Sequence, residues 1–207
     1  MKKLSLVLLA VVCYFNALSQ EKGSFEFGFN VGYNAATVTS GTNTNSSYRS
    51  GFNAGVIADY FFSDRWSIKT KLTYDQKGWA DGFVRDTDSG QEFKTNFNID
   101  YLSIPLMANW HFGRKRNWYL HFGPYAGILL SSKDSRFSND LKPYTHNTDI
   151  GLGYGIGVKL PVANRVKIIL ELDGQEGFTD VFKQNDVDQS FKNSRSGFNA
   201  GLLFQLK

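Results

Sequence analysis

The three histidines of this 207-residue sequence are the side chains best suited to general acid–base chemistry near neutral pH. His111 and His121 fall at polar positions of two segments in which apolar and polar residues alternate. This parity favours a buried polar pair that hydrogen-bonds to Tyr119 or Asn109 over a catalytic or metal-binding pair. His146 lies in a polar segment that lacks the Gly-x-Ser-x-Gly motif of a nucleophilic serine. We interpret it as a solvated loop residue.

Two carboxylates could also do acid–base chemistry as a pair. Glu171 and Asp173 are two residues apart, which on a strand places them on one face about 7 Å apart, a separation that an inverting glycosidase can use. An ion network inside a barrel explains the pair more simply. The alternate glycines from Gly151 to Gly157 lack the Gly-x-Gly-x-x-Gly spacing of a dinucleotide-binding turn. The sequence therefore predicts no catalytic residue, no cofactor and no metal site.

The first 19 residues have the features of an export signal. Lys2 and Lys3 precede an apolar run from Leu4 to Phe15, and Ala17-Leu18-Ser19 offers small residues for cleavage. The run is too short to cross a bilayer as a helix, which takes about 20 residues. We predict a cleaved signal peptide at residues 1–19 and a single domain at residues 20–207.

Composition excludes several classes of protein. Hydrophobic residues make up 42% of the chain, which contains 1 Cys and 4 Pro, and this profile rules out a disordered chain and a disulfide scaffold. The formal net charge is +4, and Lys and Arg are spread along the sequence instead of forming a basic stripe. We therefore expect no nucleic-acid partner.

Hydrophobicity alternates with a period of two through the rest of the chain, as in strands with one apolar face. In the first run, the odd-numbered positions from Phe25 to Ala35 are apolar or aromatic, and the even-numbered positions are Glu, Gly and Asn. Seven more runs follow, near residues 51–60, 66–77, 101–112, 118–130, 150–160, 166–173 and 198–206. Because eight amphipathic strands can close on themselves, we predict an all-β, antiparallel, up-and-down transmembrane barrel.

The connections between these runs alternate between short and long. Three are short, at Ser63–Arg65, Gly113–Asn117 and Pro161–Arg165, and four are long and polar, at Ala36–Tyr48, Ala80–Asn96, Ser131–Asn147 and Glu176–Asn193. Bacterial outer-membrane barrels have short periplasmic turns and long extracellular loops. The pattern therefore predicts a protein of the outer membrane of a Gram-negative bacterium.

Aromatic residues and glycines indicate which face of the barrel meets lipid. A soluble lipocalin would alternate in the same way, with its apolar face turned inward. Here glycines concentrate on the polar face, as in the packed interior of a narrow barrel, and aromatic residues of the apolar face gather beside the short turns, as in the girdle at a membrane interface. The predicted periplasmic girdle comprises Phe25, Tyr60, Trp66, Trp110, Trp118 and Phe204.

The polar face carries equal numbers of acidic and basic residues. They are Glu26, Asp59, Asp75, Asp149, Glu171 and Asp173 together with Lys69, Lys71, Lys77, Lys159, Lys167 and Arg195. Because buried charges are tolerated only when they are paired, we predict an interior charge network that plugs the lumen. Asp59 and Lys69 flank the first short turn and could lie opposite each other, depending on the register.

The long loops are the expected interaction surface, since binding residues collect on loops that a rigid scaffold holds. Arginines and aromatic residues are the usual anchors of an interface. The candidates are Arg49, Arg85, Arg136, Phe137, Tyr144 and Phe178. The alternative is a coat that faces lipopolysaccharide and has no specific protein partner.

Several motifs resemble the PorT-like outer-membrane β-barrel family of Bacteroidetes. They are Tyr101-Leu102-Ser103-Ile104-Pro105-Leu106, Phe122-Gly123-Pro124-Tyr125-Ala126-Gly127, Gly28-Phe29-Asn30-Val31-Gly32 and Gln76-Lys77-Gly78. The resemblance implies a small eight-stranded barrel of the OmpA/OmpX type in the outer membrane. It also implies a link with protein secretion, with which the namesake of the family is associated. The ending Phe204-Gln205-Leu206-Lys207 departs from the terminal aromatic residue that such barrels often carry.

Three classes of function remain. A non-enzymatic barrel that presents loops for interaction is favoured, because eight strands leave no wide aqueous lumen. A small-solute porin would need more strands or oligomeric packing, and a barrel enzyme is the least favoured. The expected partners are outer-membrane lipid, lipopolysaccharide, and proteins that bind the loops or belong to secretion machinery.

Overall fold

The structure is a computed structural model that describes residues 22–40, 46–85, 90–183 and 190–206. It contains β1 (Phe25–Thr39), β2 (Arg49–Phe61), β3 (Trp66–Arg85), β4 (Glu92–Phe112), β5 (Trp118–Asp134), the short 3-10 helix η1 (Lys142–Tyr144), β6 (Thr148–Ala163), β7 (Val166–Asp180) and β8 (Lys192–Leu206). No helix in these ranges combines the length and the apolar character needed to cross a membrane. The predicted signal peptide at residues 1–19 lies outside the described residues.

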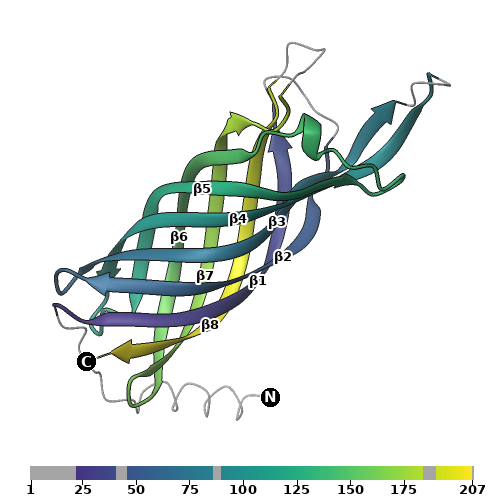
Figure 1. Cartoon of the computed structure of the whole chain (residues 1–207). Coiled ribbons are helices and arrows are strands. Elements are labelled where there is room, and N and C mark those ends of the chain that lie inside the picture. Colours follow the sequence, from purple (N-terminus) through teal and green to yellow (C-terminus); the bar gives the residue numbers. More distant parts are fainter. Residues whose placement is uncertain (1–21, 41–45, 86–89, 184–189, 207) are drawn as a thin grey trace, which may run out of the picture.

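The eight strands close into one antiparallel barrel (Figure 1). Each strand pairs with the next along the chain, and β1 also pairs with β8. Phe25 lies opposite Tyr60 on one side and Leu206 on the other. Both ends of the described chain therefore lie at the end of the barrel that carries the short turns. The predicted eight-stranded up-and-down topology is confirmed.

The apolar face of the strands points away from the interior. In β1, Phe29 and Val31 are 50% and 62% exposed, whereas the intervening Asn30 is 3% exposed. A soluble barrel would bury the apolar residues and expose the polar ones. The outward apolar face is the one that a transmembrane barrel turns toward lipid, so the sequence assigned the two faces correctly.

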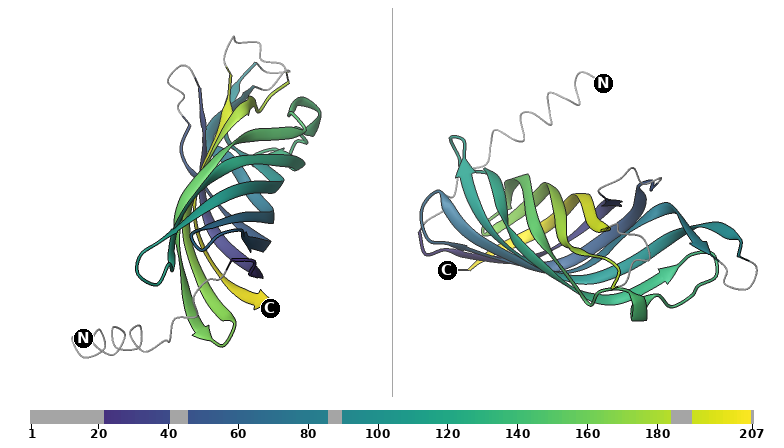
Figure 2. Two further views of the ribbon diagram at one scale, coloured as in Figure 1. Left: turned by 90° about the vertical axis from the view of Figure 1, so that its left-hand side faces the viewer. Right: turned by 90° about the horizontal axis from the view of Figure 1, so that it is seen from above.

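The second long connection is mostly paired strand, so its predicted bounds were wrong. Strand β3 continues to Arg85 and β4 begins at Glu92, and the two strands pair from Gly82 opposite Thr95 up to this point. We call residues 82–85 and 92–95 the arm. It projects beyond the rim of the barrel at the long-loop end (Figures 1 and 2). A β-bulge between Trp79 and Gly82 shifts the register there, which interrupted the alternation in the sequence.

Other predicted bounds also shift, because backbone pairing continues where alternation ends. Strands β1, β5 and β7 run to Thr39, Asp134 and Asp180, inside the stretches predicted as loops. Pro161 lies in β6 opposite Lys167, so the third short turn is only residues 164–165. The alternation of short and long connections is nevertheless as predicted.

Candidate functional site

The lumen contains all twelve residues of the predicted interior charge network. Asp173 is half-buried and the other eleven are buried. Strand β3 contributes four of them and β7 contributes three, while the rest come from β1, β2, β6 and β8. The two partners of each ion pair stand on different strands, and pairs such as Lys69–Glu171 and Lys159–Asp59 cross the lumen and tie its walls together.

The layer nearest the short turns joins two acids to two lysines. The Glu26 carboxylate accepts hydrogen bonds from Lys159 Nζ and Lys167 Nζ, each at 2.5 Å. Lys159 Nζ also donates to Asp59 at 2.7 Å. Asp59 and Lys69 are opposite each other in the β2–β3 register, but the ion pair of Asp59 is made with Lys159 across the lumen.

The middle layer is centred on Glu171. Its two carboxylate oxygens accept hydrogen bonds from Lys69 Nζ at 2.8 Å and Lys71 Nζ at 2.5 Å. The Tyr119 hydroxyl donates to the same carboxylate at 2.6 Å, and Lys69 Nζ also lies 4.5 Å from the centre of the Tyr119 ring. One buried carboxylate therefore compensates two buried ammonium groups.

Two further layers continue the network toward the long-loop end. The Arg195 guanidinium contacts Asp173 at 2.7 Å and Asp75 at 3.4 Å. Lys77 Nζ donates to Asp149 at 2.8 Å. Each of these five side chains thus has a partner of opposite sign, as buried charges require.

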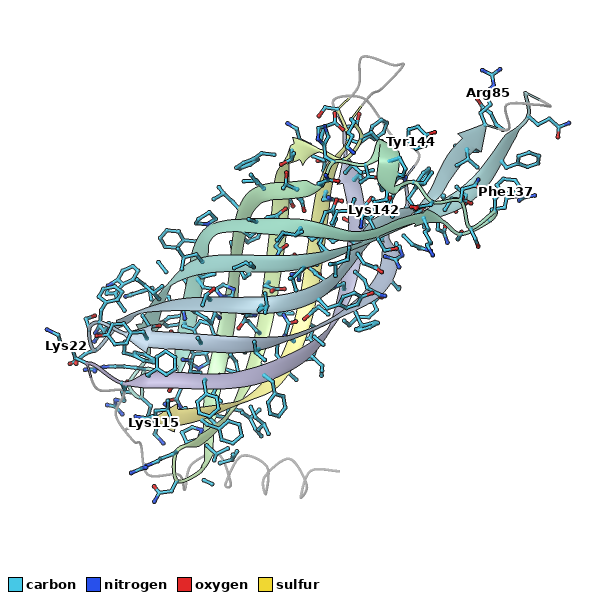
Figure 3. All side chains as sticks on the ribbon, in the orientation of Figure 1. Lys22, Arg85, Lys115, Phe137, Lys142 and Tyr144 are labelled. Carbon is cyan, nitrogen blue, oxygen red and sulfur yellow. The ribbon has the colours of Figure 1, made fainter. Side chains whose placement is uncertain are left out.

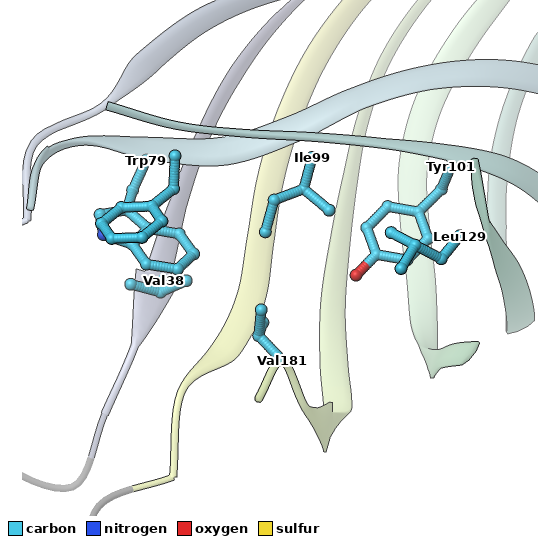
Figure 4. Close-up of a cluster of buried hydrophobic side chains, with 7 residues drawn as sticks. Val38, Trp79, Ile99, Tyr101, Leu129 and Val181 are labelled. Atoms are coloured by element: carbon cyan, nitrogen blue, oxygen red, sulfur yellow. The ribbon is translucent and has the colours of Figure 1, made fainter. Parts of the chain in front are cut away.

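An apolar cluster fills the interior beyond these layers (Figure 4). Its buried members are Val38, Trp79, Phe97, Ile99, Tyr101, Leu129 and Val181, and Phe182 and Phe191 pack against them. We call this group the aromatic cap. Sequence reasoning missed it because it looked for polar residues on the inward face. The signal was present, since apolar residues occupy both parities around residues 97–102 and 128–130.

The space left among the lumen side chains is small. A cavity of about 10 Å³ lies among Lys71, Thr73, His121 and Arg195, which is room for about one water molecule. The four ionic layers and the aromatic cap thus occupy much of the described lumen, as expected of a barrel plugged by its own side chains.

The histidines do not form the predicted hydrogen bonds. His111 Nε2 lies 2.9 Å from Ser67 Oγ, and His121 has no hydrogen-bond partner within the described residues, although its Nδ1 is 3.7 Å from Glu171. Both rings instead contact the Tyr119 ring, with centroids 5.5 and 5.7 Å away. The expected partners were wrong because buried carboxylates engage them: the Tyr119 hydroxyl donates to Glu171 and the Asn109 amide donates to Asp59.

The third histidine, His146, lies in the connection between β5 and β6. His146 is half-buried, and its backbone N–H donates to Val181 O at 2.8 Å, which ties the β5–β6 connection to the end of β7. In the part of the chain that the structure describes, no three His, Cys, Asp or Glu side chains are placed to hold a metal ion.

The six residues of the predicted girdle lie on the outward parity at the short-turn end. Trp66 pairs with Trp110 across β3 and β4, and Trp110 stacks on Phe112 with ring centroids 5.4 Å apart. Phe204 of β8 packs on Phe27 at 5.5 Å. Aromatic residues in this position are typical of a membrane interface.

Four of the predicted loop residues lie at the long-loop end (Figure 3). Phe137 contacts Phe93 of the arm edge to face at 5.5 Å, and the Arg136 guanidinium lies 4.7 Å from the Phe93 ring. Tyr144 is exposed in η1, and Arg85 is exposed at the end of the arm. Exposed arginine and aromatic side chains of this kind commonly anchor interfaces.

Arg49 and Phe178 are not loop residues. Arg49 is half-buried in β2 and its guanidinium donates to the Lys77 carbonyl. Phe178 is exposed on the outward face of β7. The two strands extend further than alternation suggested, so these side chains belong to the barrel wall.

Comparison with known proteins agrees with this architecture. The profile of a family described as "Outer membrane protein beta-barrel domain" matches residues 18–183. The crystal structure of the outer membrane protein OprG from Pseudomonas aeruginosa superimposes with a TM-score of 0.61 and 11% identity, over 92% of this chain and 99% of that one. Neisserial surface protein A (NspA) gives 0.53 and 19%, over 88% and 99%. No curated protein sequence matches.

Proposed function

Because this chain belongs to the family of outer-membrane β-barrel domains, we propose that it is a non-enzymatic scaffold that presents its extracellular loops to a binding partner. The observation that carries the proposal is the filled lumen. Four layers of paired charges and the aromatic cap occupy the interior from one end of the barrel to the other. A barrel plugged by its own side chains has its outer surfaces left for function.

The contact surface of this scaffold centres on Arg136, Phe137 and Tyr144, with Arg85 at the tip of the arm. The contacts of Arg136 and Phe137 with Phe93 hold two of these groups in a fixed arrangement against the arm. Pre-ordered anchors lose little conformational entropy on binding. A protein partner is therefore favoured over a passive coat that faces lipopolysaccharide.

The resemblance to PorT-like proteins of Bacteroidetes supports a finer proposal, in which the partner belongs to protein-secretion machinery.

We also propose that residues 1–19 are removed as a signal peptide during export, since their sequence has the charged, apolar and small-residue segments in order. The small-solute porin and the barrel enzyme are disfavoured, because paired charges and the aromatic cap fill the lumen of the described residues.

The test is photo-cross-linking in intact cells. A photo-reactive amino acid is introduced at Phe137 or at Tyr144 of the full chain, with Trp118 at the opposite end as the control position. We expect a discrete protein adduct from the two loop positions, reduced by Arg136→Ala and not by Lys133→Ala. Adducts with lipopolysaccharide alone, or equal adducts from Trp118, would overturn the proposal.

A further inference from the structure

The periplasmic end of the barrel carries a strong excess of positive charge. The described charged residues before β1 and in the three short turns are Lys22, Asp64, Arg65, Arg114, Lys115, Arg116 and Arg165, which are six basic residues and one acidic residue. All are exposed except Arg116, which is half-buried. We call the six basic residues the basic rim. Figure 3 shows Lys22 and Lys115 at this end of the molecule.

This excess is confined to one end. At the extracellular end, the described residues include the bases Arg49, Arg85, Lys94, Lys133, Arg136, Lys142, Lys183 and Lys192 and the acids Asp81, Glu92, Asp100, Asp134, Asp140, Glu176 and Asp180. The sequence of the loops outside the described residues adds Asp86, Asp88, Asp186 and Asp188. The surface charge is therefore not spread evenly between the two ends of the barrel.

Among the described residues before β1 and in the short turns, one acidic side chain stands beside the six bases of the basic rim. Arg116 Nη1 lies 3.3 Å from the Asp64 carboxylate, and no other acidic side chain stands in the turns of the described chain. The nearest lumen acids, Glu26 and Asp59, are buried and already bind Lys159. Since like charges repel, a rim of this kind is costly unless anions outside the protein approach it.

The rim lies at the level of lipid headgroups. Arg65 directly precedes Trp66 of the girdle, and the Gly113–Asn117 turn joins Phe112 to Trp118. Aromatic girdles mark the boundary between hydrocarbon and headgroups, and turns of two to five residues do not reach far beyond it. The basic residues also come from all three turns and from the start of β1, so they surround the barrel.

We propose that the basic rim binds the anionic headgroups of phospholipids in the periplasmic leaflet. The phosphodiester of each headgroup is the recognised group, and Arg and Lys side chains of the turns donate to it. A ring of charge around the circumference matches the shell of lipids that surrounds a barrel. An acidic periplasmic protein would instead call for a patch on one side or for turns that project into the periplasm. Each Lys or Arg near an anionic surface strengthens association by about fivefold at low salt, and salt screens the effect.

The tryptophans of the girdle can report on this binding. The purified mature chain is reconstituted in mixtures of phosphatidylcholine and phosphatidylglycerol, one of which carries brominated acyl chains that quench Trp66, Trp110 and Trp118. Trp79 is buried in the aromatic cap and supplies a constant background. We expect brominated phosphatidylglycerol to quench several-fold more effectively than brominated phosphatidylcholine, with the preference falling at high salt.

Charge-removing variants show whether the lipid preference depends on the basic rim or on the net charge of the protein. Arg65→Gln, Arg114→Gln and Arg165→Gln combined remove half of the rim bases and should lower the preference markedly. Each single variant should lower it by a smaller factor, which keeps the test open if the combination fails to fold. The matched control combines Lys133→Gln, Lys142→Gln and Lys183→Gln at the extracellular end and should keep the preference. No preference in the parent, an unchanged preference in the rim variant, or an equal loss in the control would overturn the proposal. A basic rim that binds an acidic protein instead of lipid would give no preference in the parent or an unchanged preference in the rim variant.

Discussion

Replacing Glu171 with Gln should destabilise the barrel strongly although it changes one functional group. The carboxylate compensates Lys69, which is fully buried, and Lys71, which is 7% exposed. The glutamine preserves the volume and one hydrogen-bond acceptor but leaves two ammonium groups without their shared counter-charge.

The magnitude follows from this geometry. Removing one partner of a buried ion pair typically costs about 3 to 5 kcal/mol, because the remaining charge is uncompensated in a poorly solvated site. Lys71 retains Asp173 at 4.0 Å. Lys69 retains the Tyr119 hydroxyl at 3.5 Å and the ring of the same residue, while Asp59, which lies opposite it in the register, is already paired with Lys159. We therefore expect a loss of about 3 to 5 kcal/mol, most of it from Lys69.

Urea unfolding of the protein from lipid vesicles, followed by tryptophan fluorescence, measures this loss. The matched control is Glu92→Gln, the same replacement at an exposed position of the arm, which should change the free energy of unfolding by less than about 0.5 kcal/mol. Adding Lys69→Met to Glu171→Gln should recover about 1 kcal/mol or more, because the orphaned charge is gone. A loss of less than about 1 kcal/mol for Glu171→Gln, or one no larger than that of the control, would refute the view that the Glu171 carboxylate stabilises the barrel by compensating Lys69 and Lys71.

Three further results are expected. Gly123→Ala should destabilise the barrel more than Gly127→Ala on the same inward face of β5. A Cβ would lie 2.1 Å from Leu106 O at position 123 and no closer than 3.3 Å to any neighbouring atom at position 127. The expected cost of Gly123→Ala is about 1 to 3 kcal/mol by urea unfolding, and equal effects of the two substitutions would contradict the packing. Pure protein in a planar bilayer should give no steady channels, because the lumen is filled, and large, weakly selective conductance would instead favour the porin. The hydrogen bond with the Ser47 side chain lowers the pKa of Asp81, so Asp81 stabilises the base of the arm above its unfolded-state pKa, and this contribution disappears as the pH falls through the lower folded-state value. The protection factors of the arm amides, in which intrinsic exchange is divided out, should therefore fall between about pH 5 and about pH 3. Asp81→Asn should remove most of this fall.

Alternation in the sequence was sufficient to predict the number of strands, their order and which residues share a face, and the glycines and the aromatic girdle then indicated which face points outward. These properties are local, since a strand places successive side chains on opposite faces whatever its neighbours are. The prediction of an inward Glu26 and an outward Phe29 needed only the next few residues. The same parity rule assigned Glu171, Lys69 and Arg195 to the lumen before any pairing was known.

The ends of the strands could be predicted only in part, because backbone pairing continues beyond the residues in which hydrophobicity alternates. The arm lies above the apolar belt, so no lipid face imposes a hydrophobic pattern on it. The bulge between Trp79 and Gly82 then inverts parity within β3. Arg49 and Phe178 were placed in loops for the same reason, although backbone hydrogen bonds hold both in strands.

The partners inside the lumen were decided by the tertiary structure alone. Glu171 meets Lys69 across 102 positions of the chain, and Lys159 meets Glu26 across 133. Local sequence determines that a charge points inward, but the stagger and twist of eight closed strands determine which inward charges come within reach of one another. The aromatic cap has the same origin, because its members come from four strands and from the segments next to β7 and β8, and converge only once the barrel closes.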